Sequence, residues 1–386
     1  MNQKKRILIV HHSGNLGGAP RSLSFLLDKI DYLRYEVELL CIKRGPGLNL
    51  FRGRPLNLII NERIFPFHGS TVSGMHFKLF IKNLLYAPQS FLAARKLIKL
   101  RMPELVHLNS SSLFIVAMAA KSVSIKIKVV CHIREPLLRR SFAGWLIKTF
   151  CYLYVDEFIA IDKFAAASMK TRNNIKIVYN AVNFEEYNPD IKSKILRQEL
   201  RLPAASIIFL YLARFSESNG TLQLIQMAKA LSGKYNHFHF VLAGLKSGHS
   251  DGYTSRVVQS AFGNPHIHLM PFREDVPSII ASCDILVVPF TEPHFARSIV
   301  EAAAIGKPSI GSNLGGVNEL IVNGETGFLY DTPDELQQYC EILGTDESLR
   351  LRMGTDAVLF AKRNFDNRIS SALVFKTYDK LLTESV

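Results

Sequence analysis

Short apolar runs alternate with helical patterns along this chain, and the alternation stops and restarts near the middle. In the first half, strands are predicted over residues 7–10, 36–42, 56–60, 105–108 and 127–131, and helices over 21–30, 77–102 and 113–123. Such alternation predicts a parallel sheet with helices on both faces. The helix over residues 77–102 contains Pro88 and is expected to break or kink there.

The pattern begins again after a polar stretch at residues 183–202. Strands are predicted over residues 207–212, 238–243, 266–269, 285–288, 308–311 and 328–330. We therefore predict the fold class α/β, with two Rossmann-like doubly wound parallel-sheet domains facing a cleft, an arrangement that suits a chain of 386 residues. The N-terminal domain is placed at residues 1–183, the C-terminal domain at 184–368, and a final helix at 369–386 that packs back on the N-terminal domain.

Positive charge is concentrated in the first half. The net charge is +14, and residues 63–155 hold 14 Lys plus Arg and two acids, a contribution of 14 − 2 = +12. Basic segments with interleaved aromatic residues, at 77–102 and 137–155, are typical of proteins that bind anionic membrane surfaces. No nucleic-acid motif is present, so nucleic acid is not an expected partner.

Cellular location is predicted from what the chain lacks. No apolar run reaches the length of a membrane span. Its five cysteines are scattered without CxxC spacing, which fits a reducing cytosol and argues against a zinc site. We expect a cytoplasmic protein that lies peripherally on the inner face of the cell membrane.

Ligands of doubly wound sheets bind at the carboxyl ends of the strands. A glycine-rich stretch that includes Gly17 and Gly18 follows the first strand, but it lacks the GxGxxG spacing of a dinucleotide fold. It is either a phosphate-binding turn or a plain strand–helix turn. His132 follows the strand over 127–131 and could contact a sugar hydroxyl, carry a proton or be structural. His11 and His12 are weaker candidates of the same kind.

The second half carries charged residues at strand ends. Arg214 ends a strand beside a helix start, a position suited to a diphosphate. Glu292 and Glu301 flank another predicted helix start, and Glu301 could accept two hydrogen bonds from a ribose diol. The amides that could hold phosphate oxygens there belong to Ala296, Arg297 and Ser298. No Asp-x-Asp occurs, so we expect neither a metal nor another cofactor, and the positive charge must come from Arg, Lys and helix N-termini.

Taken in order, these motifs resemble glycosyltransferase family 4, whose members are retaining enzymes of the GT-B fold. Residues 178–183 look like the family's Val-Tyr-Asn-Gly-Val-Asp, and residues 214–220 look like its Gly-Arg-Leu-x-x-x-Lys-Gly phosphate loop. The loop at 272–276, which contains Arg273, looks like the one that lies against the base. Residues 292–301 resemble Glu-x7-Glu, and residues 315–319 resemble Gly-Gly-x-x-Glu.

The resemblance implies a role for each matched residue. The implied contacts are Glu301 to the ribose, Arg214 to the diphosphate, Glu292 to the donor sugar, Gly17 and Gly18 over the phosphate, and His132 near the reacting carbon. Asn219 departs from the pattern because the family has a lysine there. The two glutamates are also one residue further apart than usual. Lys246 or Arg297 could replace the lost cation.

The implied reaction is transfer of a sugar from a UDP- or GDP-sugar, with retained configuration and no metal. A glycan or lipid-linked acceptor in bacterial-type surface polysaccharide synthesis is the expected partner. Two alternatives stay open. One is a catalytically weak relative that binds nucleotide-sugar or membrane, motivated by Asn219 and Glu292, and the other is a GT-B epimerase. The sugar, the base, the linkage and the oligomeric state are not predicted.

Overall fold

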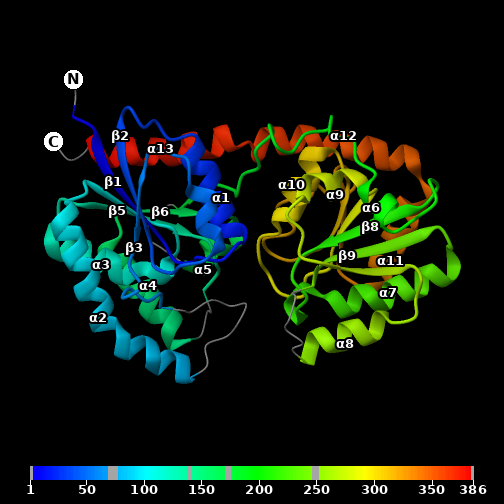
Figure 1. Ribbon diagram of the computed structural model, residues 1–386, viewed down its shortest axis with the longest axis horizontal. Coiled ribbons are helices and arrows are strands. Elements are labelled where there is room, and N and C mark those ends of the chain that lie inside the picture. Colours follow the sequence, from blue (N-terminus) through cyan, green and yellow to red (C-terminus); the bar gives the residue numbers. More distant parts are fainter. Residues whose placement is uncertain (1–2, 68–76, 138–140, 170–174, 246–251, 384–386) are drawn as a thin grey trace. The chain divides into compact units, whose positions relative to one another are not determined.

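The computed structural model describes residues 3–67, 77–137, 141–169, 175–245 and 252–383. It divides into two compact units (Figure 1). The first comprises Met1–Ala181 and Asn367–Val386, and the second comprises Val182–Asp366. The chain therefore leaves the first unit, forms the second and returns. Lys246, one of the two possible replacement cations, lies outside the described residues.

The first unit contains a seven-stranded parallel sheet in the order β3-β2-β1-β4-β5-β6-β7. Its strands are β1 (Lys5–His11), β2 (Tyr35–Cys41), β3 (Asn57–Ile60), β4 (Leu105–Leu108), β5 (Lys128–Ile133), β6 (Glu157–Ala160) and β7 (Lys176–Ile177). Its helices are α1 (Gly18–Asp28), η1 (Pro46–Phe51), α2 (Phe77–Arg101), η2 (Ser111–Leu113), α3 (Phe114–Val123), α4 (Phe142–Tyr154), α5 (Lys163–Met169) and α13 (Asn367–Thr383). The α2 helix continues through Pro88, so the chain does not break there.

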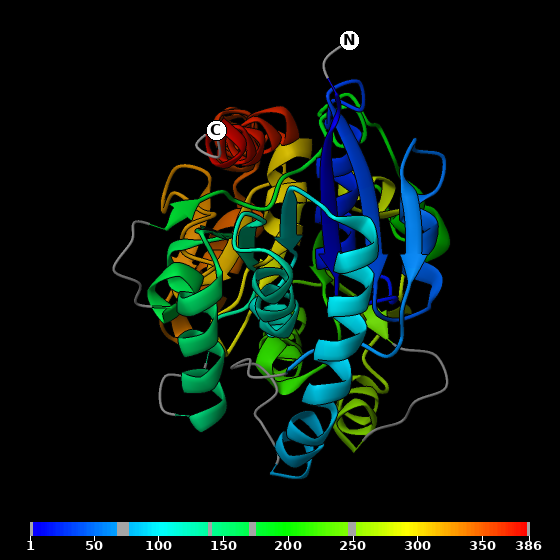
Figure 2. The ribbon, with the colours of Figure 1, turned by 90° about the vertical axis from the view of Figure 1, so that its left-hand side faces the viewer.

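The two faces of this sheet are covered by different helices. Ile7 and Ile9 of β1 share a buried cluster with Leu23 of α1 and with Tyr378 and Leu381 of α13. Helices α2 and α3 lie side by side in the same unit (Figure 2). Side chains alternate between the two faces of the sheet along a strand. Because helices cover both faces, the strands are continuous apolar runs. The last helix of the chain thus forms part of the core of the first unit.

The second unit contains a six-stranded parallel sheet in the order β10-β9-β8-β11-β12-β13. Its strands are β8 (Ile207–Leu212), β9 (Phe238–Leu245), β10 (Ile267–Pro271), β11 (Ile285–Val288), β12 (Ser309–Ser312) and β13 (Gly327–Tyr330). Its helices are α6 (Ile195–Glu199), η3 (Glu217–Asn219), α7 (Thr221–Lys234), α8 (Gly252–Ala261), α9 (Val276–Ser282), α10 (Arg297–Ile305), α11 (Pro333–Thr345) and α12 (Glu347–Asn364). The expected α/β fold with two parallel sheets is confirmed.

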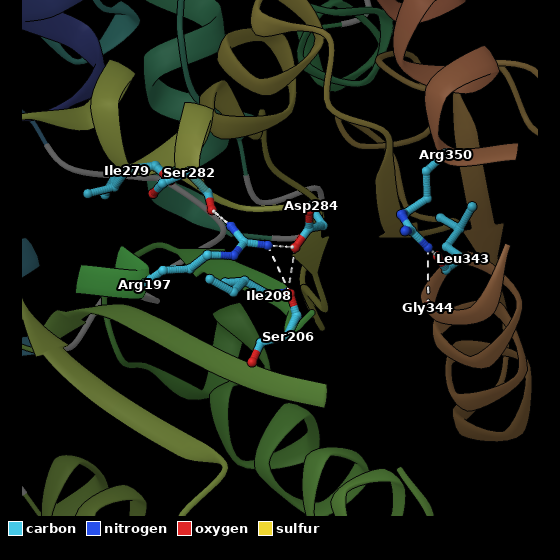
Figure 3. A network of polar contacts seen from close by, with 9 residues as sticks. All are labelled: Arg197, Ser206, Ile208, Ile279, Ser282, Asp284, Leu343, Gly344 and Arg350. Carbon is cyan, nitrogen blue, oxygen red and sulfur yellow. Dashed lines mark hydrogen bonds and ion pairs between the residues drawn. The ribbon is translucent and has the colours of Figure 1, made fainter. Parts of the chain in front are cut away.

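A partly buried arginine fastens α6 to the amino edge of this sheet (Figure 3). Arg197 donates from Nη1 to the carbonyl of Ser282, and from Nη2 to the carbonyl of Ser206 and to Asp284 Oδ2, each at 2.8 Å. Ser206 and Asp284 immediately precede β8 and β11, so the network lies at the end of the strands opposite to the predicted site. Arg350, also drawn, bonds to carbonyls in the last turn of α11. These contacts stabilise the second unit and do not involve the loops that follow the carboxyl ends of its strands.

Candidate active-site residues

The loop after β8 presents Arg214 to solvent. The side chain is exposed and makes no ion pair or hydrogen bond within the described part of the chain. Its backbone carbonyl, in contrast, accepts hydrogen bonds from Asn219 Nδ2 at 2.7 Å and from the Tyr211 hydroxyl at 2.8 Å. Because Asn219 is 6% exposed, its amide supports the loop and does not face a ligand. Arg214 is therefore held by its backbone with its guanidinium free to meet an anion.

The loop that carries Glu292 is fastened to the Arg214 loop. The Thr291 amide donates to the carbonyl of Ser218 at 3.0 Å, and its hydroxyl donates to that of Glu217 at 2.7 Å. Gly220 makes this approach possible, since it has a positive φ of 67° and a Cβ there would lie 1.7 Å from the Pro289 carbonyl oxygen. The Arg214 and Glu292 loops are therefore held together by hydrogen bonds and close backbone packing.

Glu292 has a buried carboxylate oxygen in need of a partner. Its Oε2 is buried and accepts no hydrogen bond from the described residues. A buried carboxylate oxygen without a donor is costly, and such groups at functional sites commonly await a ligand. His294, two residues further along the loop, stacks on Phe290 at 4.0 Å between ring centroids, and burial lowers its pKa, with the Arg214 charge acting in the same direction. Glu292 is thus partly buried, with a carboxylate oxygen that could accept from a sugar hydroxyl.

Helix α10 begins at Arg297 and has no side-chain cap. Ala296 occupies the N-cap position and has no side-chain acceptor to offer, although its carbonyl accepts from the Ile299 amide at 3.1 Å. The first-turn N–H group of Ser298 can therefore meet an anion. One turn later Glu301 is 7% exposed, and Arg297 Nη2 lies 3.1 Å from its Oε1. Arg297 is consequently engaged with Glu301 and is not a free replacement for the missing lysine.

Arg273 is also engaged. It forms ion pairs with Glu199 of α6 and with Asp275 at 2.8 and 2.7 Å, and its side chain is 17% exposed. These hydrogen bonds, that to Asp275 first, raise the pKa of the Arg273 guanidinium, and in turn they lower the pKa of the Asp275 carboxyl. Arg273 therefore joins α6 to the start of α9 and offers few donors to a nucleotide.

In the first unit, the glycine-rich loop is anchored at Gly14 and not at Gly17. A Cβ at Gly14 would lie 2.2 Å from the Arg44 carbonyl oxygen, whereas one at Gly17 would meet nothing within 4 Å. The carbonyl of Gly14 accepts a bond from the Gly47 amide at 2.8 Å. Gly17 and Gly18 are exposed at the uncapped start of α1, where backbone amides are accessible. The loop can therefore bind an anion through its backbone.

His132 lies in a buried row of polar residues at the carboxyl edge of the first sheet. In the parallel register, Ile9 of β1 is opposite His107 of β4, and His107 is opposite Val130 of β5. Two residues further along each strand come His11, Asn109 and His132, on the same face. His132 is 5% exposed, and burial together with the Arg134 charge lowers the pKa of its imidazole well below the ordinary value. His132 is therefore neutral at pH 7.

Arg134 belongs to this row and was missed by the sequence reasoning. It is 8% exposed and donates from Nε to Asn109 Oδ1 at 2.6 Å and from Nη1 to Asn180 Oδ1 at 2.8 Å. Its Nη2 lies 3.4 Å from His132 Nδ1. The signal that could have found it is its spacing of two from His132, which puts both side chains on one face at a strand end.

Helices α2 and α4 expose large apolar side chains among their basic residues. Phe142 and Trp145 of α4 are 61% and 59% exposed and stack at 5.4 Å, and Phe142 also contacts Phe80 of α2 at 5.7 Å. On α2 the most exposed large apolar side chains are Phe77, Leu85, Leu92 and Leu100. We call this set of α2 and α4 side chains the aromatic–basic surface. Among the described helices, none is both long and apolar enough to cross a membrane.

Two further observations concern possible ligands. A groove of about 1020 Å³ lies in the second unit at the carboxyl end of α10, lined by Lys192, Lys194 and Lys307 among apolar side chains. No predicted site residue lines it.

Within the described ranges, no three His, Cys, Asp or Glu side chains gather in a way that could hold a metal ion.

Two family models match the chain, one for each half. The model described as Glycosyltransferase Family 4 matches residues 16–186, and the model described as Glycosyl transferases group 1 matches residues 192–358. The chain belongs to glycosyltransferase family 4. It is therefore an enzyme that transfers sugars, and its two parallel-sheet units are those of the GT-B fold.

Individual relatives are similar at low identity. CapM of Staphylococcus aureus, a capsular polysaccharide biosynthesis glycosyltransferase, is 25% identical over 260 residues, which are 63% of this chain and 67% of CapM. The N,N'-diacetylbacillosaminyl-diphospho-undecaprenol alpha-1,3-N-acetylgalactosaminyltransferase of Campylobacter jejuni is 25% identical over 242 residues, 60% of this chain and 62% of that enzyme. The chain thus matches less than 70% of the length of either relative.

The fold is also that of solved glycosyltransferase structures. A crystal structure of HepE from Anabaena, in complex with UDP and glucose, superposes with a TM-score of 0.78. The match has 21% sequence identity and covers 97% of this chain and 99% of that one. At this identity the superposition shows that the two chains share a fold, and it does not show that they share a substrate.

Proposed function

We propose that this family 4 enzyme transfers a sugar from a UDP- or GDP-sugar to a lipid-linked glycan at a membrane surface, with retained anomeric configuration and without a metal. The observation that carries the donor assignment is in the second unit. There, a free guanidinium (Arg214), an uncapped helix start at Arg297 and a partnerless carboxylate oxygen (Glu292) lie on connected loops. A nucleotide diphosphate joined to a sugar offers anionic oxygens and hydroxyls to match them.

The roles of these groups follow from where charge develops. Breaking the anomeric bond leaves negative charge on the departing diphosphate, which Arg214 and the α10 amides would stabilise. Glu292 would accept a hydrogen bond from a hydroxyl of the transferred sugar, and Glu301, held by Arg297, would bind the ribose diol. The sequence suggests no nucleophile, so the favoured route is attack from the same face, assisted by the leaving phosphate. A crystal structure of HepE in complex with UDP-glucose supports a nucleotide-sugar donor here.

The acceptor assignment rests on the aromatic–basic surface and on the relatives. Exposed Phe142 and Trp145, with the basic residues of α2, form an apolar and cationic face suited to anionic lipid. The name of the Campylobacter relative describes an acceptor carried on diphospho-undecaprenol. An acceptor that is anchored in a membrane would require the enzyme to work at that surface.

A turnover screen tests this proposal. The purified protein is given a panel of UDP- and GDP-sugars with membrane lipid extract and EDTA, and released nucleotide is followed. We expect release from one donor that depends on lipid and survives EDTA, and NMR of the product should show a retained anomeric configuration. Conversion of a nucleotide-sugar without any acceptor would identify an epimerase instead. Tight nucleotide binding with no release from any donor would identify a catalytically weak relative.

A further inference from the structure

The buried row at the carboxyl edge of β1, β4 and β5 has a fixed hydrogen-bond polarity. Its centre is Arg134, whose guanidinium can donate hydrogen bonds and cannot accept them. Each of its neighbours must therefore present an acceptor. The two asparagines do so with Oδ1, at 2.6 Å for Asn109 and 2.8 Å for Asn180, and His132 does so with Nδ1 at 3.4 Å.

The contact between Arg134 and Asn109 also fixes which atom of Asn109 faces a second histidine, His11. Because Oδ1 of Asn109 faces Arg134, the amide nitrogen Nδ2 faces His11 Nδ1 at 2.8 Å. An amide NH₂ donates, so His11 Nδ1 must accept. Burial is the main cause that lowers the pKa of both His11 and His132 well below the ordinary value, so both rings are neutral. A neutral imidazole that accepts at Nδ1 carries its proton on Nε2.

Both of these Nε2–H groups lack an acceptor. His11 is 0% exposed and His132 is 5% exposed, and the Nε2 atom of each is buried with no hydrogen-bond partner among the described residues. Buried donors in folded proteins are nearly always paired, and an unpaired donor at a strand edge that carries a site points to a ligand oxygen. Two such donors in one row would contact neighbouring oxygens of a polyhydroxylated ligand.

We propose that Arg134, acting directly on His132 and through Asn109 on His11, is a positioning residue that holds both histidines as Nε2–H donors for oxygen atoms of the sugar substrate. His132 is then a hydrogen-bond donor in the reaction and not a general base. The part of this proposal that concerns substrate rests on the proposed function. The part that concerns the position of the two protons depends only on the network.

Nitrogen-15 NMR of the full-length protein with labelled histidine tests the proton positions, because protonated and unprotonated ring nitrogens have well-separated shifts. We expect the signals of His11 and His132, assigned by their loss in the His11→Gln and His132→Gln variants, to be those of the neutral Nε2–H form. Arg134→Gln should give mixed tautomers at His132, since an amide can present either atom. Arg134→Lys, which is also donor-only, should restore the single form.

A matched control is available in the same unit. Arg54 is likewise a partly buried arginine, 16% exposed, that bonds to Asp28 and Ser24. Arg54→Gln should leave both histidine signals unchanged even if it lowers the melting temperature. A wild-type His132 with its proton on Nδ1 would overturn the proposal, and so would a folded Arg134→Gln protein with unaltered tautomers.

Exchange of His132 itself tests the donor role in turnover. Gln places an amide N–H near the position of Nε2, whereas Glu places only an acceptor there. We expect His132→Gln to keep a kcat at least about tenfold above that of His132→Glu, with similar KM values for the donor. Equal or higher activity of His132→Glu would show a base and overturn the donor role. Absence of turnover in the wild-type protein with every donor would sink the proposed function, while the NMR result would still decide the proton positions.

Discussion

Asn219 donates a hydrogen bond from Nδ2 to the backbone carbonyl of Arg214 at 2.7 Å, at the position where the family has a lysine. The side chain is buried within the loop that it supports. Its substitution by Ala removes one hydrogen bond while the Tyr211 hydroxyl still serves the same carbonyl. We expect Asn219→Ala to lower the free energy of unfolding by about 1 kcal/mol, measured by urea denaturation.

The same site tests whether the lost cation matters. We expect Asn219→Lys not to raise kcat, because a lysine in this buried position must disrupt the loop before it can reach a phosphate. Nucleotide release under saturating donor is the measurement. An increase of tenfold or more would mean that the missing charge limits this enzyme, and that the loop tolerates it.

Arg214 carries the prediction for the leaving group. Since its side chain is exposed and unpaired within the described residues, Arg214→Ala should change stability by less than about 0.5 kcal/mol. Loss of its charge from the diphosphate should lower kcat on the order of a hundredfold, with Arg214→Lys intermediate. Arg352→Ala, an exposed arginine on α12, is the control and should have wild-type kinetics. A wild-type kcat in Arg214→Ala would remove this residue from the site.

Glu301 carries the prediction for the ribose. Glu301→Ala should raise the Kd for UDP or GDP several-fold, and at most about tenfold. A tenfold change corresponds to a loss of about 1.4 kcal/mol in binding free energy, and calorimetry would measure it. Because the variant also leaves Arg297 without this carboxylate, some loss of stability is expected, and circular dichroism checks the fold. Glu325→Gln in an exposed turn is the matched control. Unchanged affinity in a folded Glu301→Ala protein would contradict the assignment.

His107 should make the protein sensitive to acid. Burial, aided by the Arg134 charge, lowers its pKa from 6.5 to about 3 in the folded state. Between these values the unfolded chain binds a proton that the folded protein excludes, so this contribution to stability is complete above pH 6.5 and is lost as the pH falls towards 3. We expect His107→Gln to make the decline in unfolding free energy shallower by about 1.4 kcal/mol per pH unit over that range. Urea titrations at several pH values would show it, and an unchanged slope would be the contrary result.

Trp145 offers a direct probe of the aromatic–basic surface, since it is the single tryptophan of the chain. It is 59% exposed and stacks on Phe142. Anionic vesicles should shift its fluorescence to shorter wavelength, and uncharged vesicles should not, because insertion needs both apolar contact and charge attraction. Phe142→Ser should weaken vesicle binding, whereas Phe262→Ser, an 88% exposed residue of the second unit, should not. An unshifted spectrum at saturating anionic lipid would remove the membrane proposal.

The two sheets could be predicted from the sequence because strands buried on both faces are continuous apolar runs, as at residues 7–10 and 285–288. Strands β6 and β7 were missed. Strand β7 has two residues, which is too short for any periodicity. Strand β6 has four residues, as many as the predicted strand at 105–108, so its length does not explain why it was missed. At Pro88 the structure shows one continuous helix, whereas the sequence predicted a break or a kink there.

The site was predictable where the residue type itself has a chemical role, as for Arg214 and Glu301. It was not predictable where a distant partner decides what a side chain does. Arg273 looks like a free cation in sequence, but Glu199 lies 74 residues away and pairs with it. Arg134 looks like an isolated arginine until strands place Asn109 and Asn180, 25 and 46 residues distant, against its guanidinium.

Helix α13 has a consequence for how the protein is made. Its Tyr378 and Leu381 belong to the same buried cluster as Ile7 and Ile9 of the first strand. During synthesis the ribosome must complete the whole second unit before it releases these residues. Until then α1 covers only part of this apolar face, and the part that α13 covers stays exposed. Domains of most proteins fold in the order in which they emerge. In this enzyme the half that is synthesised first is the half that is finished last.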